Sequence, residues 1–122
     1  MRLEANEISP NRYLTVDYST PGQLLIFDKT GKALWRYNPT TKPAALSNPS
    51  LALPLPNGDV VLNDDYNHRV IVIDPKTNKI VWQYGHDGVA GTATGYLNNP
   101  DGIDLLPPHS LVGTHAATMG RP

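Results

Sequence analysis

The apolar residues of the chain gather into short runs that turn-forming residues separate. The clearest run is Arg69–Asp74, which holds four apolar β-branched residues in a row. Such a run is typical of a short strand that is buried on both faces. A loop sequence, Asp64–Asn67, precedes it and a turn sequence, Pro75-Lys76-Thr77-Asn78, follows it. The pattern predicts short strands joined by turns, and therefore an all-β fold.

Two stretches of this kind resemble each other. Each holds an apolar strand that ends in Asp, then a turn, then a strand with Trp and Tyr two residues apart. The matched pairs are Asp28 and Asp74, Trp35 and Trp82, and Tyr37 and Tyr84. The Asp residues lie 46 positions apart and the Trp residues 47, so the extra residue falls in the turn. Asn48-Pro49 recurs 51 positions later as Asn99-Pro100. Such a period predicts a repeat protein, because repeats of about 20 to 50 residues each form one supersecondary unit.

Each unit is predicted to hold four strands. In the first unit they are Leu3–Ile8, Tyr13–Asp17, Gln23–Asp28 and Ala33–Tyr37, and in the second Leu51–Leu55, Val60–Asn63, Arg69–Asp74 and Lys79–Tyr84. The strand at Leu3–Ile8 is the weakest, since Asn6 interrupts it. Two further strands, Ile103–Leu106 and Leu111–Thr114, are expected to begin a third unit. The predicted division is 1–48, 49–99, and 100–122 with a C-terminal tail.

Four strands in a unit of this length are the signature of a β-propeller blade. At Asn67-His68-Arg69-Val70 and again at 95–104 the sequence resembles the NHL repeat. The Lys-Thr turn and the Trp of the last strand are also similar to quinoprotein-type and arylsulfotransferase-type propellers. The first unit departs from the pattern, with Pro21-Gly22-Gln23 where Asn-His-Arg is expected. The predicted strands make up about two and a half such antiparallel units, which is an incomplete propeller. The resemblance implies an extracytoplasmic location, although no signal peptide is visible at the N-terminus.

Antiparallel strands sort the loops onto two faces of such a blade. The loop between the second and third strands and the connection after the fourth share one face, and the resemblance implies ligand binding there. The predicted binding residues on this face are Asp64, Asp65, Tyr66, His68, His86, Asp87, Tyr96 and Asp101. The opposite face receives Pro56-Asn57-Gly58 and Pro75-Lys76-Thr77-Asn78, which have ordinary turn chemistry.

Some of these residues are of metal-binding types. Asp64, Asp65 and His68, with His86-Asp87, provide carboxylate and imidazole groups that suit zinc or a harder cation. Asp and Asn in tight loops also cap their own backbone. We favour the second interpretation, and predict neither a metal nor a cofactor.

Other residues are predicted to be structural. Arg69 is expected to pack its stem and to pair with a carboxylate or carbonyl of a neighbouring blade. Trp and Tyr two residues apart on one strand share a face, so Trp35 with Tyr37, and Trp82 with Tyr84, form aromatic columns. Packing between blades is favoured over a stacking platform for a sugar or a base. Asp28 and Asp74 are assigned to the turns.

Composition and charge exclude several classes of protein. Pro and Gly number 22 of 122 residues, which disfavours a helical bundle. The absence of cysteine excludes disulfides and cysteine-bearing metal sites. A net charge of −1 without a basic patch argues against a nucleic-acid partner. No apolar run approaches the roughly 18 residues of a membrane span.

Catalytic signals are weak. No serine lies in a Gly-x-Ser-x-Gly elbow, and the glycines between 85 and 95 lack the Lys-Ser/Thr ending of a phosphate loop. An arylsulfotransferase-like or lyase-like propeller enzyme acting outside the cytoplasm is the alternative, with His86 or His115 near the axis. The favoured function is a non-catalytic binding or assembly module that contacts a protein or a small molecule.

About two and a half blades leave open surfaces, because propellers close with about four to eight. The expected partners are therefore further copies of the chain or the remaining blades of a longer one. One closed solution is a six-bladed ring of three chains in which Ile103–Leu106 completes the first blade of the next copy. A self-associating structural protein, either a ring or a filament, is a further alternative.

Overall fold

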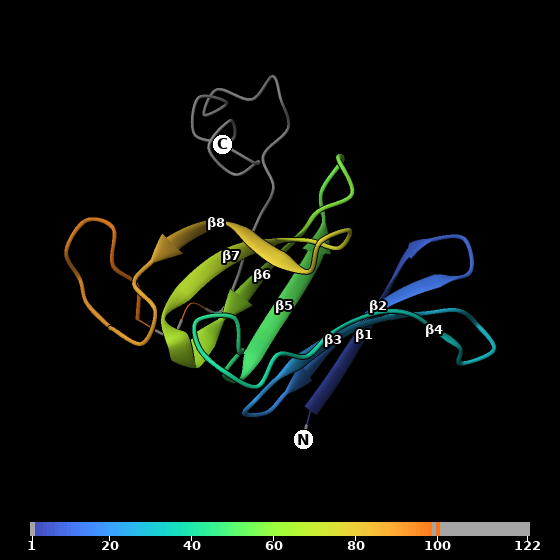
Figure 1. Ribbon diagram of the computed structural model, residues 1–122, viewed down its shortest axis with the longest axis horizontal. Helices are drawn as coiled ribbons and strands as arrows, with labels where there is room; N and C mark the ends of the chain where they lie inside the picture. The colour runs from blue at the N-terminus through green and yellow to red at the C-terminus, as the bar shows by residue number, and fades with distance from the viewer. Residues whose placement is uncertain (1, 99, 101–122) are drawn as a thin grey trace.

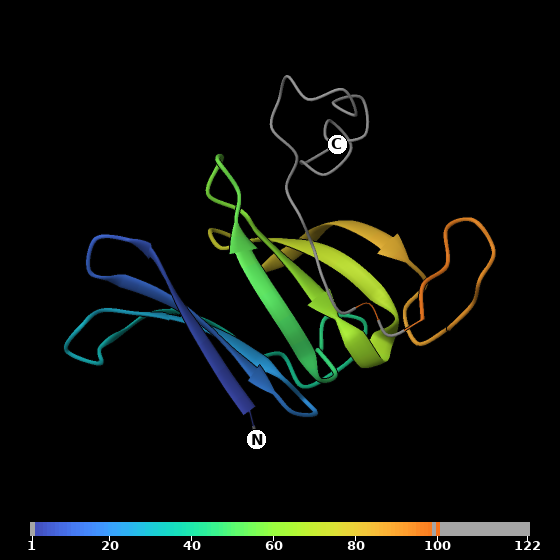
Figure 2. The same cartoon turned by 180° about the vertical axis from the view of Figure 1, so that it is seen from behind.

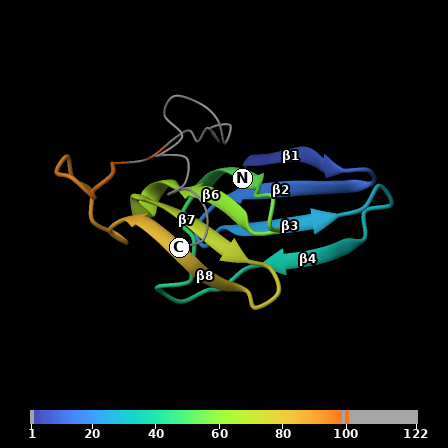
Figure 3. The ribbon, with the colours of Figure 1, turned by 90° about the horizontal axis from the view of Figure 1, so that it is seen from above.

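The computed structural model describes residues 2–98 and residue 100, and it shows two antiparallel four-stranded sheets (Figure 1). The first sheet consists of β1 (Arg2–Ser9), β2 (Arg12–Tyr18), β3 (Gln23–Phe27) and β4 (Ala33–Tyr37). The second consists of β5 (Pro49–Pro54), β6 (Val60–Asp64), β7 (Arg69–Asp74) and β8 (Lys79–Gly85). In both sheets the strands lie side by side in chain order, as the view from above shows for the first sheet (Figure 3). The all-β prediction is confirmed.

All eight strands that the sequence predicts in the first two units are present, with ends within two residues of those expected. β1 is a full strand, paired with β2 from Arg2 to Ser9. Asn6 is tolerated there because it lies exposed on an edge strand. The chain itself therefore fills the position that the ring hypothesis reserved for a strand of another copy. The strands expected at Ile103–Leu106 and Leu111–Thr114, like the rest of the third unit beyond Pro100, lie outside the described residues.

The two sheets repeat each other in register as well as in sequence. Tyr13 pairs with Phe27 in the first sheet, and Val60 pairs with Ile73 in the second. Both sheets also carry an irregularity at the same place, after Ile26 in β3 and after Val72 in β7. The register therefore extends the sequence repeat to β2 and β6, where equivalent residues lie 47 positions apart.

The turns between β3 and β4 and between β7 and β8 are closed by equivalent Asp residues. The carboxylate of Asp28 accepts hydrogen bonds from the backbone N–H of Thr30 and Lys32, at 2.9 and 3.1 Å. The Thr30 hydroxyl donates to the same oxygen, and this bond is the main reason why the pKa of Asp28 lies below its usual value. Asp74 accepts from the N–H of Lys76 at 2.9 Å. A side chain thus holds each turn.

The largest buried cluster lies between the two sheets, where β5 contacts β1 and β2 (Figure 2). Its members from the first sheet are Leu14, Val16, Leu24 and Tyr37, and those from the second are Ala52, Val60, Leu62, Ile71 and Ile73. A smaller cluster lies on the other side of the second sheet, and contains Leu55, Val61 and Val72 with Trp82 at its border.

Unlike faces of the two repeats meet in this core. We call the front face the side of each sheet that carries Trp and Tyr of the last strand, and the back face the opposite side. The front face of the first sheet holds Leu14, Val16, Leu24, Ile26, Trp35 and Tyr37, and its counterpart in the second sheet holds Val61, Asn63, Val70, Val72, Trp82 and Tyr84. The front face of the first sheet packs on the back face of the second. The two sheets therefore stack front to back, in the same orientation, and not face to face.

Candidate functional site

The predicted loop face brings three segments together: the 3-10 turn η1 (Asp65–Asn67), the connection 38–48 between the sheets, and the connection that follows β8. The Gly88 N–H donates to the Asn67 carbonyl at 2.9 Å. The Lys42 ammonium donates to the Asn67 side chain and, at 2.7 Å, to the Asp87 carboxylate. Residues that are distant in sequence therefore form one polar surface at this end of the second sheet.

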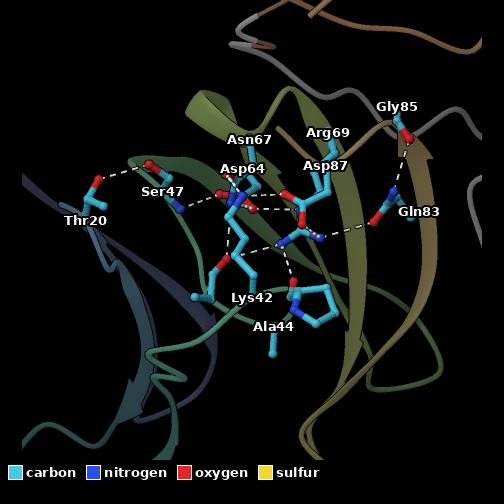
Figure 4. A network of polar contacts seen from close by, with 12 residues as sticks. Thr20, Lys42, Ala44, Ser47, Asp64, Asn67, Arg69, Gln83, Gly85 and Asp87 are labelled. Carbon is cyan, nitrogen blue, oxygen red and sulfur yellow. Dashed lines mark hydrogen bonds and ion pairs between the residues drawn. The ribbon is translucent and has the colours of Figure 1, made fainter. Parts of the chain in front are cut away.

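Arg69 lies at the centre of this region, fully buried (Figure 4). Its Nε donates to Asp64 at 2.8 Å, and the Asp64 side chain is fully buried as well. The remaining guanidinium nitrogens donate to the Pro43 and Ala45 carbonyls at 2.8 and 3.2 Å, and to the Gln83 side chain at 3.1 Å. A buried ion pair is tolerated when hydrogen bonds satisfy its other polar atoms, and here they do.

The carboxylate of Asp64 is occupied by the protein itself. Besides Arg69, it accepts a hydrogen bond from the Ser47 backbone N–H at 2.7 Å and one from the Asn67 amide at 2.8 Å. The Asn67 amide also donates to the Ala45 carbonyl at 3.1 Å. We call this set the Arg69 network, and it consists of Lys42, Ser47, Asp64, Asn67, Arg69, Gln83 and Asp87. It fixes the connection between the two sheets.

Asp65, a second predicted binding residue, is also buried, and it accepts a hydrogen bond from the Ser50 hydroxyl at 2.8 Å. The Ser50 side chain belongs to β5, so this bond joins η1 to the first strand of the second sheet. Asp64 and Asp65 therefore hold the loop in place rather than facing solvent. His68 ends η1 in the left-handed conformation, with a φ of 56°.

Several aromatic rings lie on the loop face. Tyr66 is 53% exposed and contacts Tyr18 edge to face, with ring centroids 6.1 Å apart. His86 stacks on Tyr96 at 3.9 Å, and its Nδ1 lies 3.1 Å from the Gly95 carbonyl oxygen. Asp101 and His115 lie outside the described residues. The loop face thus carries the Tyr66 ring, the stacked His86–Tyr96 pair and the Lys42–Asp87 ion pair.

Within residues 2–98 and 100, no group of three His, Asp or Glu side chains is placed to hold a metal ion. No helix in the same part of the chain is long and apolar enough to cross a membrane.

A depression of about 500 Å³ lies on the opposite face, between the β5–β6 and β7–β8 turns. Its lining residues are Asn57, Gly58, Asp59, Asp74, Pro75 and Lys76. Several of its polar groups close the turns: Asn57 accepts from the Asp59 N–H at 3.0 Å and donates to its carboxylate. The sequence analysis assigned Asn57, Gly58, Pro75 and Lys76 to ordinary turns, and the hydrogen bonds of Asn57 and Lys76 have that character.

Sequence reasoning did not find four members of the Arg69 network, namely Lys42, Ser47, Asn67 and Gln83. Nothing in their spacing marks them, because the connection 38–48 contributes Lys42 and Ser47, η1 contributes Asn67, and β8 contributes Gln83. The Asp64–Arg69 pair does leave a signal in the repeat. Asp17 and Gln23 occupy the equivalent positions of the first unit, and the Gln23 amide donates to Asp17 at 3.1 Å. Aligning β2 with β6 exposes this pair.

The packing of the two sheets buries the phenol of Tyr37 and changes its pKa. It is fully buried, and its hydroxyl donates to the Ala44 carbonyl at 2.6 Å. Burial raises the pKa of Tyr37 to about 12, the Asp64 charge adds to that rise, and the Arg69 charge opposes it. The Arg69 network and the aromatic column of β4 therefore meet at one place.

Comparisons with known proteins give no family: no protein-family model and no curated protein matches the chain.

Proposed function

We propose that the chain is a segment of an NHL-like β-propeller and acts as a non-catalytic binding and assembly module. The observation that carries this proposal is the direction of stacking: the front face of one repeat packs on the back face of the next. Two sheets that bury like faces form a closed sandwich. Two sheets that bury unlike faces leave one copy of each face for a further neighbour.

The geometry within each sheet supports the same proposal. Both repeats have four antiparallel strands in chain order, which is the arrangement of a propeller blade. The first strand of the second sheet, β5, contacts the first sheet. The Arg69 network fixes the connection between the sheets, and with it their mutual orientation. A fixed step from one blade to the next is what a propeller requires.

The binding part of the proposal rests on the loop face. The exposed ring of Tyr66 and the stacked pair of His86 and Tyr96 lie on loops that hydrogen bonds join to one another and to the connection between the sheets. Aromatic rings held in place are efficient contact groups, since they bury a large area at a small cost in conformational entropy. We expect this surface to contact a protein or a small apolar ligand.

A tandem polypeptide of two full chains tests the blade assignment. If the faces are blade faces, the second chain of the tandem covers the front face of the first, and stability rises as neighbours are added. We expect a higher denaturation midpoint in urea for the tandem than for the single chain, with one cooperative transition. Equal midpoints for the tandem and the single chain would contradict the assignment. The matched control is a tandem that carries Leu25→Glu in its second chain only.

A further inference from the structure

We propose that segment 101–106 of this chain packs across the central part of the front face of the second sheet, over Val61 and Val72, with Ile103 directed toward the sheet. The partner of this part of the face is thus the chain itself. The inference rests on the proposed function, because it takes the contact of β5 with the first sheet as the template for the next contact along the stack. The segment lies outside the described residues, and both the face and the sequence repeat point to it.

The burial of Val61 and Val72 requires a cover on the front face. Both side chains are fully buried. A fully buried side chain has neighbours on all sides, whereas its own sheet supplies neighbours only along and across the strands. Among the described residues, the cluster that holds the two valines draws all its members from the second sheet and its turn, between Leu53 and Trp82. Since the valines are buried within a single chain, the chain itself supplies the cover.

The back face of the first sheet provides a comparison, because no described element packs on it. Tyr13, Leu25 and Phe27 on that face are only partly buried. Leu25 and Phe27 lie on β3, which has a strand on each side, as β7 has. Val72 of β7 is nevertheless fully buried, whereas Tyr84 of β8, on the same front face, is 43% exposed. The cover therefore lies over β6 and β7 and leaves β8 open to a further neighbour.

The sequence repeat identifies the residues that supply this cover. Asn48-Pro49 leads into β5, and Asn99-Pro100 recurs 51 positions later. β5 contacts β1 and β2 of the sheet before it, and Ala52 of β5 lies in the core between the two sheets. Ile103 is the equivalent of Ala52. The same step along the stack therefore places segment 101–106 on the second sheet, with Ile103 in the contact.

The alternation along the segment agrees with this placement. Successive residues of a strand point to opposite faces. Leu53 and Leu55 belong to the cluster on the front side of the second sheet, whereas Ala52 lies on its back side. Their equivalents, Asp104 and Leu106, therefore point away from the second sheet when Ile103 points toward it. The charged residue of the segment thus lies on the side that does not pack on the valines.

The side-chain sizes on the two faces also fit the contact. Three front-face residues are one carbon smaller in the second sheet than in the first. The equivalent pairs are Leu14 and Val61, Leu24 and Val70, and Ile26 and Val72. The first sheet meets Ala52, and Ile103 has three more side-chain carbons than Ala52. The loss on the face equals the gain on the segment, as close packing at constant volume requires.

Thiol labelling tests the cover, because the chain has no cysteine and each introduced thiol is unique. Val72→Cys places a thiol under the proposed segment, and Tyr84→Cys places an exposed reference thiol on the same face. The rate of reaction with dithiobis(nitrobenzoate) is measured at several protein concentrations, with mass from light scattering and folding from circular dichroism. Ile103→Glu is added to Val72→Cys to displace the segment, and Leu106→Glu, on the opposite side of the segment, is the matched control.

A covered face predicts that the Val72→Cys thiol reacts at least about tenfold more slowly than the Tyr84→Cys thiol, because it reacts only when the cover opens. Ile103→Glu removes this protection, and Leu106→Glu leaves it unchanged. Equal rates for the two Glu variants overturn the proposal. Protection that falls on dilution overturns it as well, because a second molecule would then be the cover.

A size exchange tests the same contact if Ile103→Glu does not fold. Val72→Ile adds one carbon to the face, and Ile103→Val removes one from the segment. Residues in contact are not additive, so the double variant is expected to be more stable than the sum of the single changes, by about twofold or more in the equilibrium constant of unfolding. Leu106→Val combined with Val72→Ile is the control, and its changes add. Equal behaviour of the two pairs overturns the proposal.

The labelling and tandem experiments fail separately. A Val72→Cys thiol that reacts as fast as the Tyr84→Cys thiol removes this inference and leaves the tandem prediction standing. Equal midpoints for the tandem and the single chain, together with a protected Val72→Cys thiol, remove the blade assignment and leave the cover in place.

Discussion

The two sheets have the same strand order and the same register, yet equivalent residues lie in different surroundings. Tyr37 is buried against the second sheet, whereas Tyr84 is 43% exposed. Asp64 has partners for both of its oxygens, whereas Asp17 has a partner for one. The difference lies in the neighbours of each sheet and not in the sheet itself. Position in the stack therefore decides how much each repeat contributes to stability.

The two Asp pairs differ in charge as well as in partners. Asp64 faces the guanidinium of Arg69, whereas Asp17 faces the neutral amide of Gln23. Arg69 donates to two carbonyls of the connection that enters the second sheet. Among the described residues, no such connection enters the first sheet, so Gln23 has no equivalent carbonyls to reach. The charged pair of Asp64 and Arg69 therefore lies at the contact between the two sheets, and it stabilises that contact.

Removing Arg69 has the largest effect that we predict. Arg69→Ala leaves Asp64 as an uncompensated buried charge, a change that typically costs about 3–5 kcal/mol. The free energy of unfolding, measured in urea, falls by that amount. The matched change in the first sheet, Gln23→Ala, removes one hydrogen bond to a carboxylate and costs about 1–2 kcal/mol. Equal losses for the two variants would show that the charged pair has no special role between the sheets.

A double variant sharpens this test. Replacing both partners, as in Asp64→Leu with Arg69→Met, removes the buried charge together with its counter-charge. Such replacements are often neutral or stabilising. We expect the double variant to recover part of the free energy that Arg69→Ala loses, because the charge is removed while the Ser47 N–H and the Asn67 amide still lose their acceptor.

Gly22 provides a second test of the contact between the two sheets. A Cβ at this position would overlap the Pro49 ring at the start of β5, and Gly22 also donates its N–H to the Leu46 carbonyl at 2.9 Å. The first sheet thus touches the second without room for a methyl group. Gly22→Ala is expected to cost about 1–3 kcal/mol through overpacking. Its control is Gly58→Ala, where no atom lies near the new Cβ and only the positive φ of 93° is penalised, by about 1 kcal/mol.

The strands and the repeat could be predicted from sequence because both depend on local patterns. The apolar run at Arg69–Asp74 and the turn at Pro75–Asn78 specify β7 and its end without reference to the rest of the chain. β1 was expected to be weak on account of Asn6, but an edge strand exposes one side and accepts a polar residue there. Local sequence patterns thus suffice to predict the strands and their order in each sheet.

The candidate site could be predicted only in part, because its geometry depends on contacts between distant segments. The sequence placed Asp64, Tyr66 and Asp87 on one face but did not distinguish a carboxylate that an arginine engages from one that solvent reaches. That distinction requires the connection 38–48, which supplies Lys42, Ser47 and two carbonyls. The connection has no periodic pattern, so its partners are visible only in three dimensions.

The smallest expected effect concerns the phenol hydroxyls of Tyr37 and Tyr84. At neutral pH, Tyr37→Phe loses the bond to the Ala44 carbonyl and costs about 1 kcal/mol, whereas Tyr84→Phe changes stability by less than about 0.5 kcal/mol.

The raised pKa of Tyr37, about 12 against 10 for a free phenol, adds a pH dependence. Above pH 10 the unfolded chain loses this proton while the folded chain keeps it, so wild-type stability falls as pH rises through the window from 10 to 12. One pKa unit corresponds to about 1.4 kcal/mol, so near pH 11 the advantage of wild type over Tyr37→Phe is expected to vanish. Urea titrations of both variants at pH 7 and pH 11 measure it, and an advantage of Tyr37 that persists unchanged at pH 11 would show that the covered front face does not exclude water from this phenol.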